Sequence, residues 1–243
     1  MHRPQEEEDL LVITKRLMNV VVLLATGIAS AMAAGQSPAI RIEKLDGDPR
    51  VIDAGGGERT LAAGTTLTPG QTLLTGTNDR LAVVIGARGQ SPGDLLVLGA
   101  DARVALTPGN DPLRTGVRVD GGDVQLIVRG LQGKPSVDLT VAGHEVVLDG
   151  ASLVTRVQPD KKEATVWVRA GTAAIATGTR KAKIRSGMFR TVEDGRIRGA
   201  RRFVIEDWND VAARVHMVGL DTTQPAHVRP TPPSSTRAAR PST

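Results

Sequence analysis

The sequence predicts an all-β protein, built from many short, mostly antiparallel strands in a sandwich or a solenoid-like β domain, with one amphipathic helix near the C-terminus. Three observations lead to this prediction. Between residues 39 and 197, short runs of Val, Ile, Leu and Ala recur about every 8 to 12 residues, and turn residues separate them. Nothing in that stretch sustains a helical period. A helical period appears only beyond residue 203.

The N-terminal residues have the pattern of a secretory leader. Lys15 and Arg16 precede an apolar run over residues 17–28, and small residues follow at 30–34. The run is shorter than the roughly 20 apolar residues of a transmembrane helix. We therefore expect residues 1–34 to be a cleaved signal peptide and the mature protein to be exported, periplasmic or associated with the cell envelope, without a stable membrane span. An uncleaved membrane anchor is the alternative.

Composition restricts how the remaining chain is stabilised and what it binds. The sequence has no cysteine, which excludes disulfides, thiolate metal sites and thiol redox chemistry. It has two Phe, two Trp and no Tyr, so the core must be mainly aliphatic. This disfavours carbohydrate and single-stranded nucleic-acid ligands, which commonly stack on aromatic side chains. The roughly 200 residues after the leader suffice for one sizeable domain or two small ones.

Alternation and glycines divide the β segment into strands. Residues 40–45 alternate apolar and polar side chains, and the turn residues 46–49 end this strand. The further expected strands are residues 81–85, 95–98, 102–106, 116–119, 124–128, 137–141, 146–148, 153–157, 164–169 and 173–176. Strands this short favour a sandwich, barrel or solenoid over βαβ units.

Glycine-rich segments between these runs are predicted to be tight turns. Residues 109–111 and 121–123 resemble pieces of calcium-binding repeats, but they do not recur at the nine-residue period that such repeats need. Glycine and Asn or Asp together favour a turn. The glycines at 55–57 precede a β pattern, so they do not cradle phosphate at a helix N-terminus.

An amphipathic helix is predicted over residues 201–220, behind a β domain at residues 35–200. Val204, Trp208, Val211, Val215 and Val218 recur at steps of four and three. This helix either docks on an open face of the β domain or binds a partner. The Pro, Ser, Thr and Arg composition of residues 221–243 predicts a disordered tail.

The sequence contains no recognisable catalytic motif, so we expect no enzyme, no cofactor and no metal. No His-Glu-x-x-His or Gly-x-Ser-x-Gly arrangement occurs. His144 beside Glu145 is better explained as an exposed strand or turn histidine, because adjacent strand residues point to opposite faces. The enzyme alternative requires a pocket that gathers His144, Glu145 and Asp149.

Basic residues are concentrated late in the chain. Arg180, Lys181, Lys183 and Arg185 alternate with small or apolar residues, and more arginines follow up to Arg202. This pattern is typical of the outer face of an edge strand, where lysines also block aggregation. The other interpretation is a contact surface for an anionic headgroup or wall polymer.

The spacing of leucines, glycines and strands resembles a known family. The residues that carry the resemblance are Leu61, Gly64, Leu67, Gly70, Gln71, Leu73, Thr75 and Gly76, followed by the segments 81–85, 121–124, 146–154, 165–175 and 183–187. In this order they resemble the FecR-like periplasmic domain, over most of residues 39–197. The resemblance implies a periplasmic β domain without catalytic residues. Family members in iron-uptake signalling also carry a cytosolic segment that handles a sigma factor, but only residues 1–16 precede the apolar run here.

Together these observations predict an exported, non-enzymatic FecR-like domain that binds an envelope protein or an anionic surface or wall polymer, and not nucleic acid. Arg180, Lys181, Lys183, Arg185 and Trp208 are the candidate partner-binding residues. The alternative is an envelope sensor or regulator that signals through a membrane partner.

Overall fold

The computed structural model describes residues 38–87, 92–129 and 135–220, which belong to one compact unit. The predicted signal peptide at 1–34 and the predicted tail at 221–243 lie outside the described residues. Within the described ranges, no helix has both the length and the apolar character that crossing a membrane requires.

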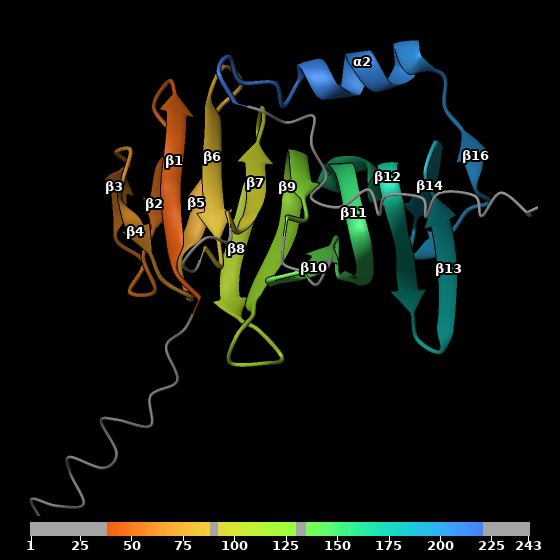
Figure 1. The fold of residues 1–243 in the computed structure, drawn as a ribbon, viewed down its shortest axis with the longest axis horizontal. Helices are drawn as coiled ribbons and strands as arrows, with labels where there is room; N and C mark the ends of the chain where they lie inside the picture. Colours follow the sequence, from red (N-terminus) through yellow and green to blue (C-terminus); the bar gives the residue numbers. More distant parts are fainter. Residues whose placement is uncertain (1–37, 88–91, 130–134, 221–243) are drawn as a thin grey trace, which may run out of the picture. The chain divides into compact units, whose positions relative to one another are not determined.

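The described residues are mostly β-strands, and the all-β prediction is confirmed (Figure 1). The strands are β1 Ile40–Asp46, β2 Arg50–Ile52, β3 Glu58–Thr60, β4 Thr66–Leu67, β5 Thr72–Leu74, β6 Arg80–Ile85, β7 Asp94–Leu98, β8 Arg103–Pro108, β9 Thr115–Ile127, β10 Val137–Val141, β11 His144–Gln158, β12 Glu163–Thr177, β13 Arg180–Arg185, β14 Met188–Glu193, β15 Arg196–Ile197 and β16 Arg201–Arg202. A single 3-10 turn, η2 Pro159–Lys161, and one α-helix, α2 Ile205–Ala213, complete the described elements.

Strand pairing forms two layers that share one core. In one layer β4, β1, β6 and β7 continue into the C-terminal halves of β9 and β11, then into the N-terminal half of β12 and into β14. In the other, β3, β2, β5 and β8 continue into the N-terminal half of β9, then β10, the start of β11, the end of β12 and β13. Among the described pairs only β9 with β10 is parallel.

Three long strands, β9, β11 and β12, bend from one layer into the other, and here the sequence prediction was wrong. We expected two short strands in place of each, with a tight turn at residues 121–123. Instead a glycine with positive φ lies inside each strand: Gly122 (+76°), Gly150 (+55°) and Gly171 (+70°). Apolar runs separated by glycine look alike whether the glycine turns the chain back or only bends it.

The glycine-rich segment at residues 109–111 does form a turn, as predicted, and a second turn lies at residues 55–57. The backbone N–H of Leu113 donates to Asp111 Oδ1 at 2.7 Å, which closes the loop between β8 and β9. At residues 55–57 the chain connects β2 to β3, and the N–H of Asp53 donates to the carbonyl of Gly57.

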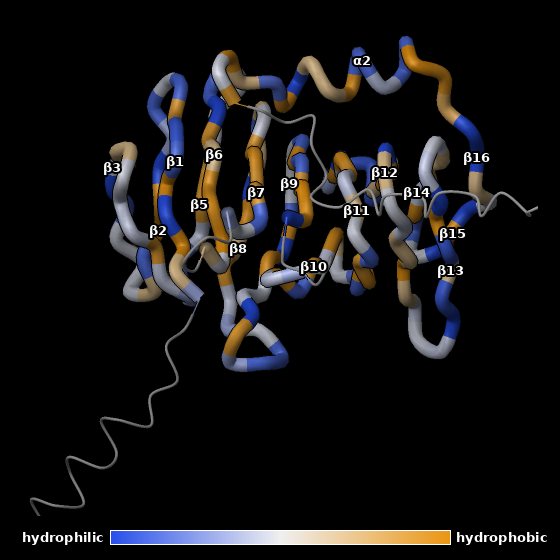
Figure 2. The backbone as a smooth tube through the Cα atoms, viewed as in Figure 1, coloured by the Kyte–Doolittle hydropathy of each residue, from blue (hydrophilic) through white to orange (hydrophobic). Residues whose placement is uncertain are grey.

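Aliphatic side chains fill the space between the two layers, as the low aromatic content predicts. The largest fully buried side chains are all Leu or Ile, including Leu73, Leu81, Leu126 and Leu153. Figure 2 shows apolar and polar residues alternating along the strands. Alternation places one set of side chains in the core and the other on the outer faces.

The helix α2 covers the outer face of the first layer. Trp208 and Val211 from α2 and Val215 beyond it pack against apolar residues of the sheet, among them Val97 and Val154. Figure 1 shows the helix running across the strand direction, on the side of β9, β11 and β12. Docking, one of the two interpretations open from the sequence, is what the structure shows.

The helix is shorter than the predicted range of 201–220. Residues 201 and 202 form β16, which pairs with β14. The N–H of Val204 donates to the Asp207 carboxylate at 3.2 Å, which caps the helix at its first turn. Val204 and Val218, expected on the apolar stripe, are 59% and 79% exposed.

Candidate functional site

Strand β13 presents the predicted basic residues as an exposed row. Lys181, Lys183 and Arg185 are exposed, whereas Ile184 between them is fully buried. Among the described strands β13 pairs with β12 only, so it is an edge strand, as expected. Its outward cations lie opposite Ala176, Ala174 and Thr172 of β12. Because these neighbours have small side chains, the cationic side chains project into solvent beyond them.

The chain around β13 is strongly cationic. Between residues 169 and 202 there are ten Lys and Arg but only two carboxylates, Glu193 and Asp194. Glu193 accepts a hydrogen bond from Arg198 Nε at 2.9 Å. Within residues 38–87, 92–129 and 135–220, none of Arg180, Lys181, Lys183 and Arg185 forms an ion pair.

Trp208, the fifth predicted contact residue, does not join this row. Its side chain is 2% exposed and belongs to a second core, the buried cluster between α2 and the outer face of the first layer. The ring stacks on Phe203, with centroids 5.8 Å apart, and the guanidinium carbon of Arg169 lies 5.5 Å from its centroid. Trp208 therefore holds α2 on the sheet and offers almost no surface to a partner.

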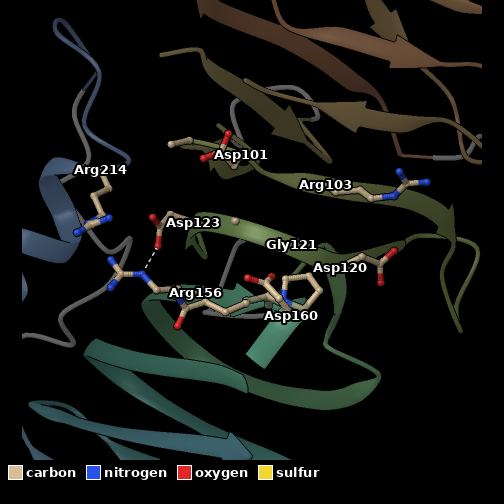
Figure 3. A pocket seen from close by; sticks show the side chains of 13 residues that line it. Asp101, Arg103, Asp120, Gly121, Asp123, Arg156, Asp160 and Arg214 are labelled. Atoms are coloured by element: carbon tan, nitrogen blue, oxygen red, sulfur yellow. Dashed lines mark hydrogen bonds and ion pairs between the residues drawn. The ribbon is translucent and has the colours of Figure 1, made fainter. Parts of the chain in front are cut away.

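A charged cavity of about 460 Å³ lies where β9 bends and β11 ends (Figure 3). Four aspartates and three arginines line it: Asp101, Asp120, Asp123, Asp160, Arg103, Arg156 and Arg214. Arg156 Nε donates to Asp123 Oδ1 at 2.7 Å, and the Asp123 side chain is 8% exposed. The guanidinium carbon of Arg156 also lies 5.6 Å from the Trp167 ring centroid. Arg156 is thus held by an ion pair on one side and an aromatic ring on the other.

His144, Glu145 and Asp149 are not gathered in one pocket. His144 lines a separate cavity of about 420 Å³, together with Asp120, Lys162 and Asp194. Its Nδ1 lies 3.2 Å from Thr177 Oγ1. Glu145 and Asp149 line neither this cavity nor the charged one and are exposed. In the described part of the chain, no three His, Asp or Glu side chains are placed to hold a metal ion.

A third hollow, of about 570 Å³, follows the edge of α2 and was not predicted from the sequence. Its lining comes from β11, β12, β14 and α2, and includes Trp167, Phe189 and Asp210. Alternation along residues 163–167 places Glu163, Thr165 and Trp167 on one face of β12. This alternation could be read from the sequence, but it does not indicate that a helix beginning at residue 205 forms the neighbouring wall of the hollow.

Comparison with known proteins gives no family for this chain. No family model matches it, and no curated protein matches it. Two solved structures of a protein from Parabacteroides distasonis ATCC 8503, described as a "putative anti-sigma factor", are similar at 14% and 16% identity, each with a TM-score of 0.46. They match 57% and 59% of this chain, and the match covers 62% and 65% of theirs, less than two thirds of their length.

Proposed function

We propose that this protein is a non-enzymatic binding domain of the cell envelope, and that strand β13 binds an anionic surface or wall polymer. The observation that carries the proposal is the row of exposed cations at Lys181, Lys183 and Arg185, with Arg180 at its start, which have no ion-pair partner among the described residues. An exported protein meets polyanions chiefly as lipid headgroups and wall polymers.

The geometry of a strand suits a repeating anion. Alternate residues on one face of a strand are about 6.6 Å apart, so the three outward cations form an evenly spaced line. The strand is fixed by its hydrogen bonds to β12 along its whole length, from Thr172 opposite Arg185 to Thr177 opposite Arg180. A polymer would therefore bind a backbone that is already ordered, which lowers the entropic cost of binding.

The test is to replace all four cations by glutamine: Arg180→Gln, Lys181→Gln, Lys183→Gln and Arg185→Gln. A matched control removes the same charge from four exposed arginines that already pair with carboxylates: Arg41→Gln, Arg50→Gln, Arg59→Gln and Arg118→Gln. We expect the β13 variant to lose salt-sensitive retention on an anionic resin and on isolated envelope, and the control to keep most of it. Equal retention of the two variants would refute the proposal.

The alternative function, an envelope sensor that acts through a membrane partner, predicts a different form of the protein in cells. Intact-mass measurement on fractionated native cells separates the two. A soluble species that begins near residues 33–36 supports the free binding domain. A full-length species in the membrane fraction supports the sensor.

A further inference from the structure

The helix α2 leaves part of the outer sheet face uncovered. Together with Val215 and Met217, which follow it, α2 packs over a cluster of outward side chains from β6, β7, β9 and β11, such as Ala82, Leu95 and Val154. Beyond its edge, the outward residues of β12 and β14 form the floor of the 570 Å³ hollow, which we call the trough. Its floor includes Thr165, Trp167, Phe189 and Thr191.

The floor of the trough is flat and partly aromatic. Trp167 and Phe189 are register neighbours on β12 and β14, and both are partly exposed. Their rings stack with centroids 6.0 Å apart and an interplanar angle of 28°. Beside them, the hydroxyl oxygens of Thr165 and Thr191 lie 3.0 Å apart. Such a floor can bind the aliphatic stem of a long side chain, and it attracts cations to the ring faces.

The wall along α2 is acidic. Glu206, Asp207 and Asp210 line the trough from the helix, and Glu163 lines it from β12. Of these four carboxylates, only Asp210 has an ion pair within the described ranges, with Arg214 at 3.9 Å between two well-exposed side chains. Arg156 at the end of the trough is already paired with Asp123. The trough therefore combines an aromatic floor with negative charge that is little compensated, which is complementary to an extended segment bearing arginine or lysine.

We propose that residues 229–240 of the same chain occupy this trough. The segment carries Arg229, Arg237 and Arg240, and no Asp or Glu follows Asp221. Prolines at 230, 232 and 233 favour an extended backbone, which suits a flat floor. The charge and the expected conformation of the segment thus both match the trough.

The segment can also reach the trough. Leu220 packs against the buried cluster beneath α2, and Lys44 of β1 donates a hydrogen bond to the carbonyl of Val218, so the chain leaves from the sheet face that carries the trough, at its β1 end. From β1 to β14 this layer has six strand spacings of about 4.8 Å, or roughly 29 Å. The 17 residues from Leu220 to Arg237 span up to about 55 Å when extended, which leaves ample length to return along the helix.

Trp167 provides a direct readout, because the proposed occupant would cover it. In a Trp208→Phe background Trp167 is the remaining indole. We expect Arg229→Gln, Arg237→Gln and Arg240→Gln, introduced together into the full chain, to increase acrylamide quenching of Trp167. Unchanged quenching would overturn the proposal. Protection of Trp167 that depends on protein concentration would assign the trough to a second copy and also overturn it.

A titration with a synthetic peptide of residues 225–243 tests the same contact in trans. Added to the full-length triple-Gln protein, the peptide should bind by calorimetry, a readout that works with Trp208 intact. Glu163→Gln, Glu206→Gln and Asp210→Asn, introduced together into this protein, should raise the Kd of the peptide roughly tenfold, the size expected for losing three exposed ion pairs. Asp207 is retained because it caps α2.

The control variant removes three exposed carboxylates elsewhere: Glu43→Gln, Glu58→Gln and Glu145→Gln. It should bind the peptide as the parent does, and equal weakening in both variants would overturn the proposal. This inference is independent of the proposed polymer binding. The β13 variant with four glutamines keeps Arg229, Arg237 and Arg240 and all the trough carboxylates, so its retention on an anionic resin and its Trp167 quenching report separately on the two proposals.

Discussion

At the scale of single residues, two glycines with positive φ, one inside a long strand and one in a turn, differ in what surrounds them. A β-carbon on Gly171 would lie 2.2 Å from the carbonyl oxygen of Gly150, and its φ of +70° is unfavourable for any side chain. Gly178, in the turn between β12 and β13, has a similar φ of +56° but nothing within 4 Å of an added β-carbon. Alanine substitutions at these two positions therefore distinguish the cost of a positive φ from the cost of steric overlap.

We therefore expect Gly171→Ala to lower the free energy of unfolding by about 3 kcal/mol or more, because the neighbouring backbone must move. Gly178→Ala should cost only the left-handed conformation, about 1 to 2 kcal/mol. Urea denaturation of both variants measures the difference. Equal losses would mean that β11 and β12 can separate at this bend without cost.

A second residue-scale prediction concerns Asp53 in the β2–β3 hairpin. Its carboxylate accepts hydrogen bonds from Gln71 Nε2 at 2.6 Å and Arg59 Nε at 3.2 Å. The hydrogen bond from Gln71, and then that from Arg59, holds the pKa of Asp53 below its ordinary value. The stability that this carboxylate contributes is present above the unfolded-state pKa, near 3.9, and is lost as the pH falls through the lower folded-state pKa.

Gln71→Leu should raise the pKa of Asp53 toward its ordinary value and reduce that acid-dependent loss. A carboxyl-carbon NMR titration on the folded protein measures it directly. Arg59→Gln should raise this pKa as well, because it removes a hydrogen-bond donor and a positive charge. An unchanged pKa in Gln71→Leu would show that the side-chain hydrogen bond is not formed in solution.

At the scale of elements, α2 depends on a small apolar contact. Trp208 is 2% exposed and sits among aliphatic residues of the sheet, so Trp208→Ala should destabilise the protein by about 3 to 5 kcal/mol. Thermal and urea denaturation provide the measurement. Ile205→Ala, at a position 59% exposed on the same helix, should change stability little. A stable Trp208→Ala variant that had lost a partner would make α2 an interface instead.

Elements were predictable from the sequence where their pattern is local. Alternation at residues 180–185 predicted an edge strand, and steps of three and four around Trp208 predicted an amphipathic helix. The bent strands were missed because pairing partners decide whether a glycine turns or bends the chain. For β9 these partners are β8 and β10 before the bend and β7 and β11 after it.

Features formed by residues that are far apart in the sequence could not be predicted from it. Asp94 is fully buried and accepts hydrogen bonds from the backbone N–H groups of Arg129 and Ser136, which are 35 and 42 residues away. The trough likewise combines residues near 165, 190 and 207. Neither arrangement leaves a pattern within one stretch of the sequence.

At the scale of the whole described unit, one core joins the two sheet layers, and this predicts cooperative unfolding. Leu73 in β5 and Ile184 in β13 belong to the same buried cluster. Leu73→Ala should cost about 2 to 5 kcal/mol, and the far strands should unfold with it. Circular dichroism reports the strands, while Trp167 and Trp208 report β12 and α2. Coincident transitions are expected, and two separate ones would show that the unit unfolds in independent parts.

The bent strands also limit how this domain can move. Two sheets made of separate strands can slide over each other, as packed elements do in shear motions. Here β9, β11 and β12 are covalently part of both sheets, so sliding would require breaking their pairing at the bends. The β13 surface and the trough therefore belong to two sheets that we expect to move together. A force or a ligand at either surface would displace both sheets as one body, and the distance between the two surfaces would stay fixed.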